Sequence, residues 1–306
     1  MNIDSPFMLR LPISKKIISI IKSAINAVNP YLITKNALEL EDSALSIGNV
    51  NYSTSNIRRI ILIGAGKAAQ QMALGVKDKL AGFPVSGFVI VKNVDLTIEK
   101  KLAPQIKTLA GNHPIPGEDS YTSTRQLISL IHDLNLNDLV ICLISGGGSA
   151  LLTYPFEDIG HGDLQELTEC LLRCGAEIGE INTIRKHLDK IKGGGLARMV
   201  YPAKMITLIL SDVIGDPMDM IASGPTVADP TTFTDALNIL NKYKLRDKIS
   251  NSIWRYLSEG SKGKICETMK PGDPILKNVN NIIMANNSVA AEAAMHTAHK
   301  VGFNSA

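Results

Sequence analysis

The fold of this chain follows from the stretch Asp138–Ser149, which reads DLVICLISGGGS. After the leading aspartate, the residues up to Ile144 are apolar and include β-branched side chains, which is typical of a strand buried on both faces. Three glycines between two serines come next, so the strand should end in a tight loop. The stretch therefore predicts a central strand of a parallel sheet with a polar loop at its carboxyl end.

The same succession of strand, turn and helix recurs on both sides of this stretch. Strands are predicted at 59–63, 86–91, 107–110, 204–210 and 279–284. Helices are predicted at 14–28, 67–80, 118–134, 162–174, 181–191, 234–243, 250–258 and 286–300. Such alternation predicts an α/β fold with three layers, a doubly wound, mostly parallel sheet with helices on both faces. We expect one Rossmann-like domain over residues 1–306, with amino-terminal helices at about 14–45 and an irregular segment at 46–58.

Composition excludes several classes of protein. Apolar residues make up 45% and charged residues 20% of the 306 residues, as in a globular chain. The net charge of +3 is too small to predict a nucleic-acid surface. The first twelve residues lack a basic region followed by an apolar stretch, and no apolar run reaches the roughly 20 residues that a membrane span needs. We therefore expect a cytoplasmic protein with no membrane partner. Assembly into a homodimer is compatible with the sequence.

Three polar loops follow predicted strands: Gly64–Lys67, Ser145–Ser149 and Ser211–Asp216. Ligands bind outside the carboxyl ends of the strands in open α/β sheets, so these loops should meet at one rim. In the first loop, the start of a helix and Lys67 favour an anion, with Gly64 and Gly66 allowing close approach. Ala69 stands where a dinucleotide fingerprint needs glycine, and the spacing to Lys67 differs from a Walker A loop. A plain tight turn with an exposed lysine is the alternative.

The second loop, Ser145-Gly146-Gly147-Gly148-Ser149, has the composition of an anion-binding nest. Its glycines let the backbone approach a ligand and direct several N–H groups at one point, and its serines add hydroxyl donors. A hydrolase nucleophile at Ser149 is disfavoured, because Leu151 occupies the position of the second glycine in that motif. The alternative is a loop without a ligand.

The third loop contains two carboxylates, Asp212 and Asp216, four residues apart. Carboxylate oxygens suit Mg²⁺, and phosphoryl transfer needs both a metal ion and a group that orients the attacking hydroxyl. A helix cap and a turn are the alternative roles for these aspartates. Ser223 follows shortly downstream, and we expect it to complete the same pocket wall.

Two further segments supply candidate ligand-binding side chains. Arg185 and Lys192 lie on and after a basic predicted helix, and the planar guanidinium suits bidentate pairing with a carboxylate. His113 lies in a proline-rich loop before another helix, and its side chain titrates near neutrality. The alternatives are a solvated helix face for the basic residues and a structural hydrogen bond for the histidine.

Taken together, these motifs resemble the glycerate 2-kinases that have an additional carboxyl-terminal MOFRL domain. The matching segments, in the order of the family, are Ile63–Ala69, Gly111–Pro116, Ser145–Leu151, Asn182–Gly194, Ser211–Pro217 and Ser223–Asp229. The resemblance implies transfer of phosphate from ATP to the 2-hydroxyl of D-glycerate, with Mg²⁺. It covers the chain from about residue 15 to its end.

The resemblance also implies roles for the matched positions. Lys67 is similar to the catalytic lysine of the family, and the loop Ser145–Ser149 to its nucleotide-phosphate loop. Asp212 and Asp216 resemble the catalytic and metal-binding carboxylates of the family, and the resemblance does not say which aspartate has which role. Arg185 and Lys192 would anchor substrate or phosphate, and His113 and Ser223 would lie on the substrate side.

The family builds its active site between this domain and the smaller MOFRL domain, which we expect this chain to lack. Two alternatives to the kinase therefore stay open. One is a nucleotide- or anion-binding module without catalysis. The other is a hydroxypyruvate reductase, an older name in this family, although no nicotinamide fingerprint supports it here.

Overall fold

The core of the protein is a six-stranded sheet in which every neighbouring pair of strands is parallel. The computed structural model describes residues 13–304. The strands lie in the order β6 (Ile106–Ala110), β5 (Val85–Val91), β4 (Arg59–Ala65), β7 (Asp138–Ile144), β8 (Lys204–Leu210) and β9 (Val279–Ala285). The chain therefore builds outward from β4 in one direction and then from β7 in the other. In such sheets, this point of reversal is where ligands bind.

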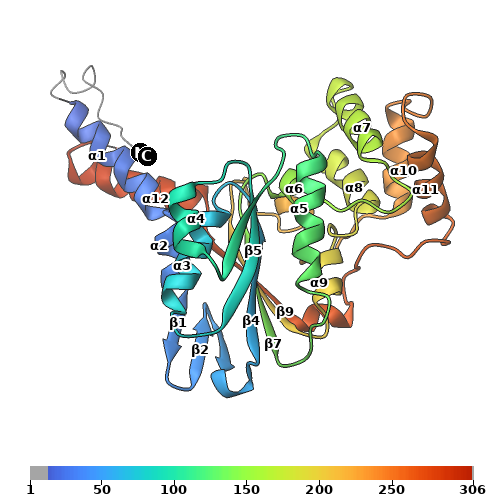
Figure 1. Ribbon diagram of the computed structural model, residues 1–306. Helices are drawn as coiled ribbons and strands as arrows, with labels where there is room; N and C mark the ends of the chain where they lie inside the picture. The colour runs from blue at the N-terminus through green and yellow to red at the C-terminus, as the bar shows by residue number, and fades with distance from the viewer. Residues whose placement is uncertain (1–12, 305–306) are drawn as a thin grey trace.

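Helices cover both faces of the sheet, so the predicted three-layer α/β fold is confirmed (Figure 1). Helices α3 (Ala69–Lys79) and α4 (Leu96–Leu102) lie on one face, and α5 (Glu118–Ser129) and α9 (Gly195–Val200) lie on the other. Side chains alternate across β4, so Ile60 and Leu62 pack under α3 while Ile61 and Ile63 pack under α5. Each of these fully buried side chains stabilises the fold by about 1.5–3 kcal/mol.

A lobe of helices extends the molecule on the side of the sheet that α5 and α9 cover (Figure 1). It consists of α7 (His161–Arg173), α8 (Ile178–Leu188), α10 (Phe233–Lys242) and α11 (Asn251–Ser261). These helices share a core of their own around Ile184, Phe233 and Leu257. The short helix α6 (Gly148–Leu151) leads from β7 towards this lobe, so the glycine loop lies where the sheet and the lobe meet.

The amino-terminal region differs from the sequence prediction. Helix α1 (Ser14–Ala27) packs along α12 (Asn287–Lys300), and α2 (Pro30–Asn36) packs against α3. The residues after α2 are not helical or irregular but form an antiparallel sheet of β1 (Leu38–Glu41), β2 (Ala44–Ile47) and β3 (Val50–Ser53). Leu38, Leu45 and Ile47 are fully buried there. Buried and less buried side chains alternate along these strands, but the strands are too short for this pattern to be recognised in the sequence.

Other boundaries also moved. Helix α5 ends at Ser129 rather than Leu134, because the chain continues with tighter i→i+3 hydrogen bonds, from Leu130 to Leu127 and from Ile131 to Ile128. Three short 3₁₀ segments, η2 (Thr54–Asn56), η3 (Ile221–Ser223) and η4 (Pro274–Asn278), connect other elements, and η3 contains non-helical backbone at Ala222. No described helix on its own is long and apolar enough to cross a membrane; α1 and α2 meet the length and composition criteria only as a pair bent by 46°.

Candidate functional site

A pocket of about 640 Å³ opens at the carboxyl ends of β4 and β7, where the strand order reverses. The glycine loop after β7 forms one of its walls, and the predicted loops meet here. The pocket is lined by His113, Pro114, Ser145, Gly146, Gly147, Gly148, Ser149, Ala150, Ile178, Asn182, Arg185, Asp212, Val213, Met220, Ile221 and Ala222.

Charged side chains from three other elements lie against the glycine loop. A Cβ atom on Gly147 would lie 2.8 Å from Cδ2 of His113 and 3.5 Å from Cε of Lys67. A Cβ atom on Gly146 would lie 2.2 Å from Oδ2 of Asp212. Gly147 also has a φ of 86°, which disfavours other residues. Glycine is therefore favoured at Gly147 by its conformation, and at Gly146 and Gly147 the backbone lies close to the side chains of Lys67, His113 and Asp212.

The two glycine-containing loops differ in what their N–H groups do. At the start of α3, the N–H of Lys67 donates to the carbonyl of Gly146 at 2.9 Å, and the N–H of Ala68 donates to Oγ of Ser145 at 3.0 Å. Within the described residues, the N–H groups of Gly146, Gly147 and Ser149 have no acceptor. The N–H groups without an acceptor therefore belong to the second loop, and the first loop donates hydrogen bonds that hold it in place.

The glycines of the first loop have packing roles. A Cβ atom on Gly64 would lie 2.6 Å from the carbonyl oxygen of Leu143, and one on Gly66 would lie 2.1 Å from Oγ of Ser145. Gly66 also has a φ of 141°. These glycines thus let β4 and its turn approach β7, and the predicted phosphate contact of Gly64 and Gly66 stays a prediction.

Helix α8 presents Arg185 to the pocket. Ile178, Asn182 and Arg185 are three or four residues apart, so they share the helix face that lines the pocket. No hydrogen bond or ion pair from the Arg185 side chain is found in the part of the chain that the structure describes. Burial lowers the pKa of Arg185, opposed by the nearby charge of Asp189. Because an arginine stays charged in proteins, this guanidinium is a half-buried cation whose donors have no acceptor among the described residues.

The electrostatics of the pocket favour a neutral His113. Burial lowers the pKa of its imidazole, the charges of Lys67 and Lys92 lower the pKa further, and Asp212 opposes them. A neutral imidazole can accept a hydrogen bond or a proton. Lys92, which follows β5, was not predicted as a site residue. Its position directly after a strand of the sheet could have indicated that it lies near the site.

Several predicted residues lie outside the lining of the pocket: Gly64, Gly66, Lys67, Lys192, Asp216 and Ser223. Ser223 is fully buried; its Oγ hydrogen-bonds Oγ of Ser149 at 2.6 Å and donates to Oδ1 of Asn182 at 3.0 Å. Asp216 accepts a hydrogen bond from Nδ2 of Asn286, while its Oδ1 is buried without a partner among the described residues. Of the two aspartates of this loop, only Asp212 lines the pocket.

Lys192 also lies behind the pocket wall rather than in it. Its side chain is 2% exposed, and Nζ donates to the carbonyl oxygens of Ser149 at 2.9 Å and Leu152 at 2.7 Å. An ion pair of 3.4 Å joins Nζ to Oδ2 of Asp189. Burial lowers the pKa of Lys192, opposed by Asp189. These contacts join Lys192 to the carbonyl side of the glycine loop.

The wall formed by residues 220–222 was missed in the sequence. Met220, Ile221 and Ala222 line the pocket, and Cβ of Ala222 lies against Gly148. Ala222 and Ser223 have positive φ values of 51° and 61°, which are uncommon for residues other than glycine. Such backbone strain often occurs at functional sites, but it cannot be recognised before the conformation is known.

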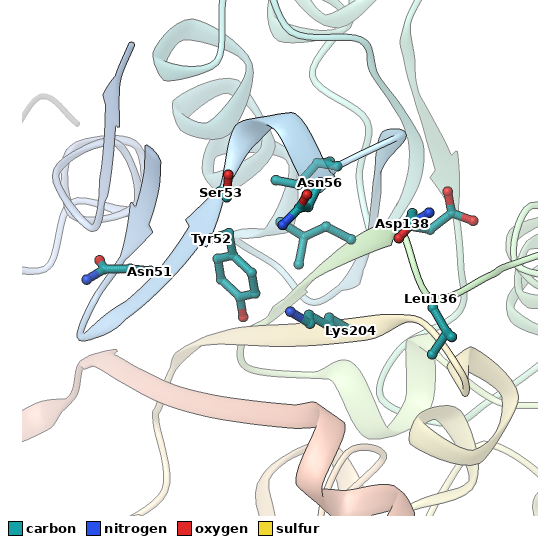
Figure 2. Close-up of a pocket in the computed structure, with 10 residues that line it drawn as sticks. Asn51, Tyr52, Ser53, Asn56, Leu136, Asp138 and Lys204 are labelled. Carbon is teal, nitrogen blue, oxygen red and sulfur yellow. The ribbon is translucent and has the colours of Figure 1, made fainter. Parts of the chain in front are cut away.

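A second pocket, of about 570 Å³, lies at the opposite, amino-terminal edge of the sheet (Figure 2). Figure 2 shows Tyr52 and Lys204 facing one another, and the lysine Nζ lies 5.8 Å from the ring centroid. Asp138 is already paired there, accepting from Arg58 at 2.7 Å and 2.8 Å and from the N–H of Asn135 at 2.9 Å. The carboxylate of this pocket is satisfied by the protein, unlike that of Asp212.

Comparison with known proteins gives the family. The model of the family described as "Domain of unknown function (DUF4147)" matches residues 16–258. This chain belongs to that family. The match spans α1 to α11, and so includes every side chain of the candidate site.

Named relatives confirm the resemblance of the motifs to those of glycerate 2-kinases. A glycerate 2-kinase from Pyrococcus horikoshii is 38% identical over 296 residues, which are 97% of this chain and 64% of the relative. A putative hydroxypyruvate reductase from Agrobacterium vitis is 39% identical over 244 residues, 80% of this chain and 52% of the relative. A crystal structure of a Pyrococcus horikoshii protein superposes with a TM-score of 0.82 at 37% identity, covering 96% of this chain and 65% of that one. The chain thus spans less than two thirds of the length of these relatives.

Proposed function

We propose that this protein takes part in the ATP-dependent phosphorylation of D-glycerate at its 2-hydroxyl group, with Mg²⁺. One observation carries the proposal: Lys67, His113, Arg185 and Asp212 surround one glycine loop, and none of these side chains has a hydrogen-bonding partner within residues 13–304. Lys67 and Asp212 are exposed and Arg185 is half-buried, so their charges are available to a ligand of opposite charge. The names of the relatives supply the substrate.

The glycine loop and Lys67 would hold the phosphates of ATP. The N–H groups of Gly146, Gly147 and Ser149 are without acceptors in the described part of the chain, as expected of an anion-binding nest. Lys67 adds a full positive charge beside Gly147. In phosphoryl transfer most of the catalysis comes from positioning and from such stabilisation of negative charge on the transferred group.

The acceptor substrate would be held by Arg185. D-Glycerate has a carboxylate, and the arginine fork pairs with a carboxylate through two parallel hydrogen bonds. Two groups beside the loop can accept the proton that leaves the 2-hydroxyl: the Asp212 carboxylate and the neutral imidazole of His113. The oxygen of that hydroxyl forms the new bond to the γ-phosphorus, and ADP leaves.

The carboxylates of the third loop fit a magnesium ion. Mg²⁺ is usually bound by one or two carboxylates together with phosphate oxygens and water. Asp212 lines the pocket, and the buried Oδ1 of Asp216 lacks a partner among the described residues, which a cation would provide. Asp212 and Asp216 would therefore hold the ion, which supplies charge neutralisation for the phosphates.

The test is an assay of ADP release with D-glycerate, ATP and Mg²⁺, coupled to a visible signal. We expect release of ADP that depends on both D-glycerate and Mg²⁺. Binding of ATP without release of ADP would contradict the kinase proposal and support a binding module. Consumption of NADH with hydroxypyruvate would support a reductase, for which the sequence offers no nicotinamide fingerprint.

A further inference from the structure

The glycine loop is held from behind by one buried cation. Lys192 donates to the carbonyl of Ser149, inside the loop, and to the carbonyl of Leu152, at the end of the short helix α6. The residues Gly146, Gly147 and Ser149 line the pocket, and their N–H groups have no acceptor in the described chain. The lysine therefore fixes two carbonyl groups of a segment that keeps three N–H groups unpaired.

All donors of this lysine are already in use. An ammonium group has three protons. Two of them go to the carbonyls of Ser149 and Leu152, and the third is directed to Asp189, at 3.4 Å. With its side chain 2% exposed, Lys192 has neither a free donor nor an open path to a ligand. Direct binding of phosphate by Lys192 would require breaking one of these contacts.

Asp189 ties the same cation to the segment that follows the loop. Its Oδ2 accepts hydrogen bonds from Oγ1 of Thr153 at 2.6 Å and from the N–H of Tyr154 at 2.9 Å, and its Oδ1 accepts from the N–H of Ile191 at 2.9 Å. One buried carboxylate thus joins residues 153–154 to residues 191–192. Because it is fully paired, it can balance the charge of Lys192 without water.

A second set of contacts links Gly193 to the glycine loop through Ser223. The N–H of Gly193, next to Lys192, donates to the carbonyl of Ser223 at 3.0 Å. The Ser223 hydroxyl is bonded to the hydroxyl of Ser149, back in the glycine loop. The loop is consequently held at Ser149 both by Lys192 and by Ser223, and its conformation depends on residues that never touch the pocket.

We propose that Lys192 and Asp189 are positioning residues that set the conformation of the loop Gly146–Ser149 for its anionic ligand, and that Lys192 does not bind the ligand itself. The identity of the ligand as ATP rests on the proposed function. The conformational part does not, because it concerns the protein without a ligand.

The test compares Lys192→Met with Lys186→Met in the nucleotide-free protein. Lys186 is a matched control, since it is 1% exposed and forms a 2.7 Å ion pair with the buried Asp229, but it does not contact the glycine loop. Amide hydrogen exchange is measured for both at Gly148, Ala150, Leu151 and Leu152, whose N–H groups are hydrogen-bonded to carbonyls of residues 145–148. We expect exchange there to be at least about tenfold faster in Lys192→Met, since a charge-assisted hydrogen bond corresponds to about 1.5–3 kcal/mol.

Titration with ATP follows, with the unmodified protein alongside. We expect Lys192→Met to bind ATP at least about tenfold more weakly than Lys186→Met. Equal exchange rates in the two nucleotide-free variants would overturn the proposal. If ATP affinity fell at the same time, that result would indicate that Lys192 binds the nucleotide directly. Failure of the unmodified protein to bind ATP would contradict the proposed function but leave the exchange comparison decisive.

If Lys192→Met does not fold, Lys192→Gln takes its place, since an amide can still donate to one carbonyl. It should give faster exchange at Gly148 and Ala150–Leu152 than the unmodified protein and Lys186→Met do. Unchanged exchange in Lys192→Gln would count against the proposal in the same way.

Discussion

The pocket and the buried network behind it differ in how their charged side chains are paired. Helix α8 shows the contrast in two adjacent residues. Arg185 faces the pocket and has no partner within the described chain, whereas Lys186 is 1% exposed and forms ion pairs with Asp229 at 2.7 Å and with Asp219 at 3.4 Å. Successive residues of a helix point about 100° apart, so one helix serves both regions. The protein thus satisfies its charges where they stabilise the fold and leaves them open where a ligand can bind.

The same rule separates His113 from His187. His187 is buried in the network, where Nδ1 contacts the carbonyl of Thr183 at 2.8 Å and Nε2 contacts Glu267 at 3.1 Å. His113 lies beside the glycine loop, with no hydrogen bond from its ring within residues 13–304. Substitutions in the network should therefore change stability, and substitutions in the pocket should change activity.

The largest effect is expected in the network. Replacing Asp229 with Asn leaves the buried Lys186 without its main counterion, and breaking a buried pair costs about 3–5 kcal/mol. Urea unfolding should show this loss of stability. The control is Asp212→Asn, an exposed aspartate, which should change the free energy of unfolding by less than about 0.5 kcal/mol. Similar losses in both variants would remove the distinction between the regions.

Lys67→Ala tests the pocket, where we expect a loss of activity without a loss of stability. We expect kcat for ADP release to fall by about 10²–10³, the usual result of removing one group that stabilises negative charge in a transition state. The melting temperature should stay the same, because Lys67 is exposed and its ammonium has no partner in the described residues. A variant that keeps its activity would show that this lysine is not part of the mechanism.

Arg185→Met sharpens the comparison, because activity and stability should move in different directions. Loss of the guanidinium should raise KM for D-glycerate by about 10- to 100-fold, the effect of removing a charge-assisted pair. Methionine also removes a half-buried charge that lacks a partner, so the free energy of unfolding should stay constant or rise. A clear loss of stability in urea would show that Arg185 belongs to the paired network.

The smallest effect concerns pH and His113. Its folded-state pKa is lowered from 6.5, chiefly by burial. Below pH 6.5 the unfolded chain therefore binds the proton more readily than the folded one, and the stability that is present above 6.5 is lost as the pH falls. His113→Gln should weaken this dependence. Melting temperatures at acidic and neutral pH should differ less in the variant than in the parent, and an equal difference would contradict the shift.

The sequence predicted the parts of the site that depend on order along the chain. Strand β7 was predicted with its observed bounds, Asp138–Ile144, because its apolar run and the glycines after it are local features. A parallel sheet then brings the loops after its strands to one rim, which is why Lys67, Gly147 and Asp212 could be expected near one another. The small sheet of β1 to β3 escaped prediction, because strands of four residues carry little periodicity.

Only the tertiary structure decided which polar side chains face the pocket. Arg185 and Lys192 looked equivalent in the sequence, yet one lines the pocket and the other is 2% exposed behind it. Likewise, Asp212 lines the pocket and Asp216 does not, and His113 lines it whereas Ser223 is buried outside it. The physical reason is that a charge or hydroxyl is oriented by the partners packed around it, and those partners come from segments distant in the sequence. Local pattern thus determined where the chain turns, and long-range packing determined which turns keep their polar groups free.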